Sequence, residues 1–229
     1  MTNRFSIRIT VCMALAAAVI ALFPSGLPAG VPHRQLQAAQ NPNPQVSPVG
    51  SSAHGKTYAE WSVLWWQWFL PLTAEQYAAC SVGQSGHVAF LLAGPAACNV
   101  TVAPGTSLFF PIANVECSDL EAAPFHGDTA DQRSACAAYW AGFVGNLAVE
   151  IDGVSLQDLA KYHVLSPDFG FTVGPDNVFA IPCSGQCSGS SSGDGYYLML
   201  APLSPGSHII HISASGFGID TTYTLNVGQ

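Results

Sequence analysis

Six cysteines beyond residue 79 restrict the folds open to this chain more than any other feature. An even number of cysteines in an exported chain indicates three disulfides. Spacing alone leaves several pairings open, and we expect the sequential one: Cys80–Cys98, Cys117–Cys136 and Cys183–Cys187. Structural zinc is disfavoured, because only the last pair has the spacing of a zinc-binding knuckle.

Residues 1–30 have the pattern of a secretory signal peptide. Arg4 and Arg8 form a positive region, and the apolar run Ile9–Phe23 follows. The run is shorter than the roughly 20 residues of a membrane-spanning helix. We therefore expect a secreted or periplasmic protein with no membrane span in its mature form. An uncleaved anchor is the alternative.

Charge is scarce in the remainder of the chain. The three basic residues after position 40 are Lys56, Arg133 and Lys161, and all 14 acidic residues lie in the same part. This balance excludes nucleic-acid binding, which needs a row of Lys and Arg side chains to neutralise phosphates. Residues 31–57 are rich in Pro, Gly and Ser and are predicted to be a flexible linker. Residues 58–229 are predicted to form a single disulfide-linked domain.

Two helices are predicted in this domain. Thr57-x-x-Glu60 has the form of a capping box, so a helix should run from Tyr58 to about Leu70 and end before Pro71. Its aromatic residues fall on one face, with Trp66 at the edge of that face. A second helix is expected near 129–146, and Thr73-x-x-Gln76 indicates one more short turn.

Short strands separated by Gly and Pro dominate the rest of the domain. We expect a hairpin around Asp152-Gly153, loops over 114–126 and 184–195, and a C-terminal β-meander. The predicted fold is mainly β: an antiparallel β-sandwich, jelly-roll or immunoglobulin-like, with a Trp-rich N-terminal helix. The predicted strands are 87–92, 99–102, 106–112, 169–173, 177–181 and, in the meander, 195–201, 207–214 and 221–227.

Several motifs resemble those of a family of exported bacterial proteins of unknown function. They are Trp61-x-x-x-Trp65-Trp66-Gln67-Trp68, the segment Pro104–Ile112, and Gly195–Leu200 followed by Pro205–His211. The resemblance covers roughly residues 58–227. It implies export but brings no activity with it.

The Trp-rich helix is one candidate site. Trp61, Trp65, Trp66 and Trp68 could stack on a glycan or contact another surface protein. The competing interpretation is that they form the core face of a helix packed on a sheet, because aromatic side chains dominate protein cores.

Metal ligands are a second candidate. His208 and His211 lie three residues apart in a predicted strand, where their side chains point to opposite faces and one ion could not take both. Glu116, Asp119 and Asp128 lie in an acidic segment that could hold Ca²⁺ through oxygen ligands. No other cofactor is expected.

No complete catalytic group is evident, and no catalytic residue is assigned. We therefore expect a non-catalytic binding or structural domain of unknown ligand. One alternative is a secreted hydrolase acting on polysaccharide or ester, which would need two acidic residues brought together; Glu60, Glu116 and Glu150 are the most apolar-flanked. The other is an extracytoplasmic metal- or small-ligand-binding protein. The sequence does not indicate an oligomeric state.

The disulfide prediction can be tested on the exported protein. Because all six cysteines are expected to be paired, titration of free thiols in denaturant without reductant should give none. The same titration after reduction supplies the control. Six reactive thiols before reduction would contradict the prediction.

Overall fold

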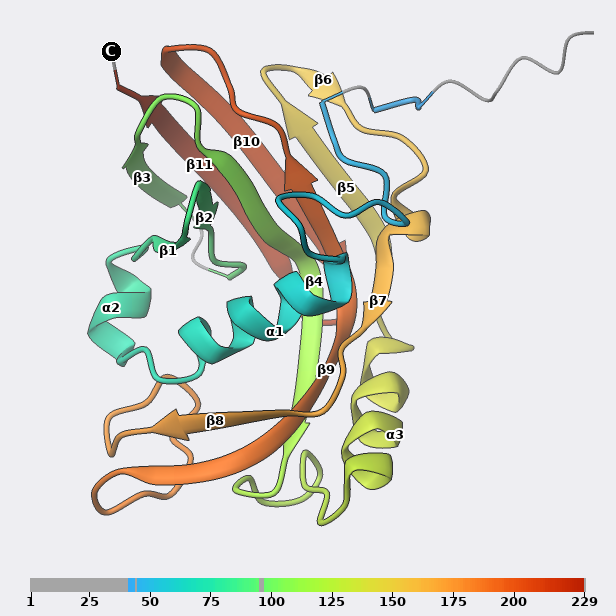
Figure 1. Cartoon of the computed structure of the whole chain (residues 1–229), viewed down its shortest axis with the longest axis vertical. Coiled ribbons are helices and arrows are strands. Elements are labelled where there is room, and N and C mark those ends of the chain that lie inside the picture. Colours follow the sequence, from blue (N-terminus) through green and yellow to red (C-terminus); the bar gives the residue numbers. More distant parts are fainter. Residues whose placement is uncertain (1–40, 44, 95–96, 229) are drawn as a thin grey trace, which may run out of the picture. The chain divides into compact units, whose positions relative to one another are not determined.

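In a computed structural model of the chain, the described residues are 41–43, 45–94 and 97–228, and they form two β-sheets with three α-helices (Figure 1). The predicted signal peptide lies outside these residues. The larger sheet has the order β1-β2-β4-β9-β7, with β8 also paired to β9. Its strands are β1 (Gly83–Ser85), β2 (Val88–Phe90), β4 (Ser107–Ser118), β7 (His163–Leu165), β8 (Phe169–Val173) and β9 (Cys187–Leu200).

The smaller sheet has the order β3-β11-β10-β5-β6. Its long strands alternate buried and exposed residues, so one face is apolar and the other is open. Both β5 and β10 contact β4, which joins the two sheets into one core. The strands are β3 (Ala97–Val102), β5 (Gly145–Ile151), β6 (Val154–Ser155), β10 (Gly206–Ser215) and β11 (Ile219–Val227).

β4 and β9 are the longest strands of the structure, and their antiparallel pair runs from the middle of the molecule to its lower part in Figure 1. Pairing extends from Leu108 opposite Leu200 to Ser118 opposite Ser191, with a register shift between Pro111 and Ala113. Successive residues of a strand point to opposite faces. The pair therefore offers two faces to the helices, and each face has its own set of side chains.

Helix α1 (Tyr58–Phe69) begins with the predicted capping box and crosses β4 and β9. Its buried face is mainly aromatic, as expected for a helix packed on a sheet. Trp65 Nε1 donates to the Leu91 carbonyl (2.8 Å), and Trp66 Nε1 donates to the Tyr197 hydroxyl (2.9 Å). These bonds satisfy the polar atoms of two deeply buried rings. A second capping box begins the short helix α2 (Ala74–Ala78).

Helix α3 (Ala130–Ala141) also packs on β4 and β9. It begins with a capping box at Thr129 and ends five residues earlier than predicted. Gly142 caps it, and β5 begins at Gly145. Arg133 anchors the helix by donating two hydrogen bonds to Asp168, from Nε (2.7 Å) and from Nη2 (2.8 Å).

Three disulfides are present, and the pairing is sequential. Cys80–Cys98 joins the end of α2 to β3, and Cys117–Cys136 joins β4 to α3. Cys183–Cys187 closes a short loop before β9. In the chain-entropy model, each of the two larger loops is worth about 3 kcal/mol. No helix of the described residues is long and apolar enough to cross a membrane.

The part of the predicted linker that the structure describes, residues 41–43 and 45–57, contacts the domain. The Asn43 side chain accepts a hydrogen bond from the Gln157 main-chain N–H and donates one to the Gln157 carbonyl. Val46 is buried and bridges to Leu200. Asn43 and Val46 therefore attach this segment to the domain, although its composition predicts a flexible linker.

Several predicted strands are also corrected. The expected loops 114–126 and 184–195 contain the ends of β4 and β9, which reach Ser118 and start at Cys187. The C-terminal meander is wrong, because β9 belongs to the larger sheet and only β10 and β11 form a hairpin. Residues 177–181 form no strand. Two strand pairs, β2–β4 and β3–β11, are parallel rather than antiparallel.

The hairpin between β5 and β6 is confirmed. Asp152 and Gly153 both have positive φ, 51° and 79°, as a type I′ turn requires.

Gly193 of β9 permits the close approach of α1. A Cβ atom at this position would lie 2.2 Å from Trp66 Nε1, so Gly193→Ala should lower the free energy of unfolding by about 1–3 kcal/mol. Gly174→Ala is the matched control, because no atom lies within 4 Å of the added methyl group. Chemical denaturation with the disulfides intact measures both variants. Equal stability of the two would contradict the prediction.

Candidate functional site

A pocket of about 420 Å³ lies beside the part of β4 that contains Asn114, Val115 and Glu116. Elements distant in the sequence contribute to it: α1, α2, β4, the segment after β4, the segment before β9 and the start of β11. It is lined by Trp65, Trp66, Phe69, Tyr77, Ala93, Gly94, Asn114, Val115, Glu116, Glu121, Phe125, Val178, Phe179, Phe217 and Ile219.

Aromatic rings form most of the pocket wall. Trp65, Trp66 and Phe69 present the buried face of α1, and Phe179 packs on it with its ring centroid 5.5 Å from that of Phe69. Phe179 and Phe217 are 43% and 39% exposed, so they line the pocket and also reach solvent. The wall is therefore apolar, and part of it is accessible.

Two glutamates supply the acidic groups of this pocket. Glu116 lies in β4 opposite Gly193, and Glu121 lies just beyond the end of that strand. Their carboxyl groups lie close enough for each to affect the pKa of the other. Ser191 Oγ donates to Glu116 Oε2, and Ser118 Oγ donates to Glu121 Oε2 (3.0 Å). Strand pairing and two serine hydroxyls thus hold both carboxyls in place.

Burial decides the protonation of this pair. Loss of water raises the pKa of Glu116 well above its usual range, and the neighbouring Glu121 raises it further. Burial also raises the pKa of Glu121. Two carboxyl groups in contact cannot both ionise cheaply, so the pair shares a proton at a pH where isolated glutamates are charged.

A third polar group belongs to the same face of the sheet. Asn114 Nδ2 donates to the Tyr197 hydroxyl (3.2 Å), which also accepts the hydrogen bond from Trp66. Burial raises the pKa of Tyr197, so this phenol stays neutral. Asn114 lines the pocket two residues before Glu116, and strand alternation places both side chains on one face.

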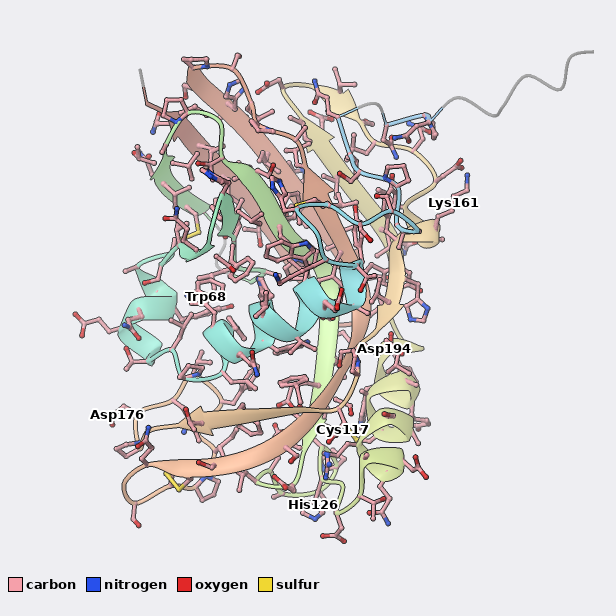
Figure 2. The ribbon with its side chains drawn as sticks, viewed as in Figure 1. Trp68, Cys117, His126, Lys161, Asp176 and Asp194 are labelled. Atoms are coloured by element: carbon pink, nitrogen blue, oxygen red, sulfur yellow. A yellow bond between two sulfur atoms is a disulfide. The ribbon has the colours of Figure 1, made fainter. Side chains whose placement is uncertain are left out.

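Basic side chains are bound elsewhere. Among the described residues, Lys56 lies over the Trp61 ring, Arg133 binds Asp168, and Lys161 lies 2.5 Å from Asp158. His126, at the lower end of the molecule in Figure 2, is directed to the Glu121 main-chain oxygen (2.7 Å) and to Asp128 (3.0 Å). The hydrogen bond to Asp128 raises the pKa of His126. No salt bridge of the described residues includes Glu116 or Glu121.

The four tryptophans of the predicted aromatic site are divided by the structure. Trp61, Trp65 and Trp66 are buried, and Trp68 is partly buried against Phe90. Trp65 and Trp66 line the pocket, whereas Trp61 and Trp68 do not. The helix therefore supplies core residues and one wall of the pocket.

The predicted metal ligands are dispersed among separate partners. His208 lies 2.7 Å from Asp152, and His211 lies 2.7 Å from Asp220. Asp119 accepts a hydrogen bond from the Ser190 main chain, and Asp128 contacts His126. Within the described ranges, no group of three His, Cys, Asp or Glu side chains is arranged to hold a metal ion.

A second buried acid lies on the opposite face of the strand pair. Asp194 of β9 is 2% exposed, and His163 of β7 lies 2.5 Å from it. Burial raises the pKa of Asp194, and His163 opposes that shift. Ser192, two residues before it, donates to Asp168 (3.0 Å), which in turn binds Arg133. This face holds α3 in place and does not open into the pocket.

Sequence reasoning identified Glu116 but missed its partner. Glu121, Asn114 and Phe179 are not among the candidate residues that the sequence indicates. The signal for Glu121 was its five-residue distance from an apolar-flanked glutamate across the end of a strand. Only the reversal of the chain after Ser118, which bridges to His126, brings the two carboxyls together.

Comparison of the chain with protein-family models, with curated proteins and with solved structures finds no match. The site is therefore interpreted from its geometry alone.

The shared proton makes stability depend on pH in a defined direction. Because folding raises the pKa of Glu116, the folded protein holds a proton that the unfolded chain releases above about pH 4.3. Folding is therefore penalised as pH rises from there to the raised pKa. Glu116→Gln removes this penalty, so the variant should gain stability over the parent as the pH rises above about 4.3.

Denaturation midpoints of both proteins across this range measure the effect. The difference should grow by about 1.4 kcal/mol for each unit by which folding raises the pKa. Glu150→Gln, at an exposed position on β5, is the control and should show no such trend. A constant difference between parent and Glu116→Gln would contradict a shared buried proton.

Proposed function

We propose that the protein is an exported, non-catalytic binding protein for a small organic ligand with a largely apolar body. The pocket beside β4 carries this proposal. Its volume of about 420 Å³ and its aromatic lining with a few convergent polar groups match ligand-binding pockets in general.

The placement of the polar groups supports binding. Asn114, Glu116 and Glu121 come from one strand and the residues after it, so the sheet fixes their positions. Most of the wall comes from other elements. A ligand entering the pocket would meet polar groups on one side and rings on the other, which gives it a defined orientation.

The hydrolase alternative is less well supported. Glycoside hydrolases keep their two carboxyls about 5–9.5 Å apart to leave room for the sugar or a water. Glu116 and Glu121 instead lie next to each other at the end of β4, where each affects the pKa of the other.

Disulfides support export, because they persist in oxidising compartments. We further infer that the two sheets pack as a β-sandwich, with α1 and α3 covering the projecting part of β4 and β9. Membership of the exported bacterial family that the motifs resemble belongs to the same proposal.

Blocking the pocket tests the function. Ala93→Phe adds a ring to the pocket wall and should weaken binding about tenfold or more. The probes are single-ring compounds with neutral, acidic or basic substituents, and ligand-observed NMR measures their affinity. Ala148→Phe is the matched control, since Ala148 is exposed on β5. Absence of binding by every probe, or equal binding by both variants, would contradict the proposal.

A further inference from the structure

We propose that the ligand is a small primary amine whose ammonium group binds between the Glu116 and Glu121 carboxylates while its apolar body contacts the aromatic wall. This inference rests on the proposed binding function and names the chemical class of its ligand. Three independent features of the site support it.

The first feature is an unsatisfied acceptor. Glu116 is 5% exposed, and its Oε1 receives no hydrogen bond from an N–H or hydroxyl group of the described residues. Its other oxygen is held by Ser191. Buried acceptors are almost always bonded, so an unbonded one inside a pocket indicates a missing donor. An ammonium group has three N–H donors and could bond both carboxylates.

The second feature is the distribution of charge. Two acids in contact need a positive charge or a proton to balance them. Lys56, Arg133 and Lys161 are engaged with other groups. His126 acts on Glu121 through its charge, but its ring lies 3.0 Å from Asp128. A cation from solution could therefore replace the shared proton as the balancing charge. Arginine or lysine beside the pair would have made the site self-neutralising.

The third feature is the aromatic wall. The negative faces of Trp and Phe rings attract cations, and more strongly where water is excluded. Trp66 and Phe179 line the same pocket as both glutamates, with ring centroids 6.4 Å apart. Such walls accept a positively charged group and equally the apolar part of the same molecule.

Binding of the amine exchanges one cation for another. The ammonium enters with its three protons, the proton shared by the carboxyls leaves to solvent, and both carboxylates remain charged. Affinity should therefore rise with pH until the shared proton is lost in the free protein.

Other titratable groups around the pair leave this direction unchanged. Tyr77 from α2 and Tyr197 from β9 stay neutral, because burial raises the pKa of each. His126 faces Glu121 from the following loop and lies against Asp128. Asp119 also acts on His126 through its charge. α1 contributes Trp65 and Trp66, which do not titrate.

Three probes of one shape separate charge from size: 2-phenylethylamine, 2-phenylethanol and 3-phenylpropionate. Titration calorimetry near pH 7 should show the amine binding about tenfold or more tightly than the alcohol, and the carboxylate binding most weakly. Repeating the amine titration in two buffers of different ionisation enthalpy should show a proton released on binding.

Glu116→Gln and Glu121→Gln should each lower the affinity for the amine about tenfold or more, bring it to that of the alcohol, and abolish proton release. Glu150→Gln should behave as the parent. Circular dichroism checks that each variant is folded. If Glu116→Gln disturbs the structure, Glu121→Gln still tests the inference, because Glu121 is less buried.

The outcomes distinguish this inference from the proposed function. Equal affinity for amine and alcohol, unaffected by either glutamine variant, would overturn the cationic ligand and leave a neutral binding pocket in place. Failure of all three probes to bind the parent protein would count against the binding function itself.

Discussion

The close contact between the Trp66 indole and the β9 backbone governs the arrangement of the structure. Gly193 lets the ring approach, and the Tyr197 hydroxyl accepts its N–H. This contact fixes α1 across the strand pair and leaves the other side of Trp66 facing the pocket. A bulkier residue at position 193 would displace the helix from the sheet, and with it one wall of the site.

Because side chains alternate along a strand, the two faces of β4 make different contacts. Asn114, Glu116 and Ser118 point toward the pocket side, where Ser118 and Ser191 hold the carboxyl pair. Cys117 points the other way and is linked to Cys136 of α3, whose neighbour Arg133 is tied to Asp168. The disulfide and this ion pair attach α3 to the face of the sheet opposite the pocket. The β4 backbone that carries Glu116 is therefore packed on both faces.

Local signals in the sequence predicted local structure well. The Thr57 and Thr73 capping boxes and the Asp152-Gly153 turn all formed, because each depends on residues within a few positions. The start of β9 was missed, since a run of Ser and Gly usually indicates a loop. Its small residues are required by tertiary contacts: a Cβ at Gly189 would meet Asp119 and Leu120, and one at Gly193 would meet Trp66. Packing overrode propensity there, and no local pattern could have shown it. The Glu116–Glu121 contact depends in the same way on a chain reversal that spacing does not encode.

The scarcity of basic residues favours a binding role over a structural role for the two glutamates. Burying two acids in contact costs free energy that glutamine at either position would remove, so the pair contributes nothing to stability that a neutral residue could not. The buried Arg133 side chain is neutralised by Asp168, whereas the buried Glu116 takes part in no salt bridge of the described residues. Glu116 and Glu121 both line the accessible pocket. A structural role would place the compensating charge inside the protein, whereas a binding role leaves its place open for a positively charged ligand.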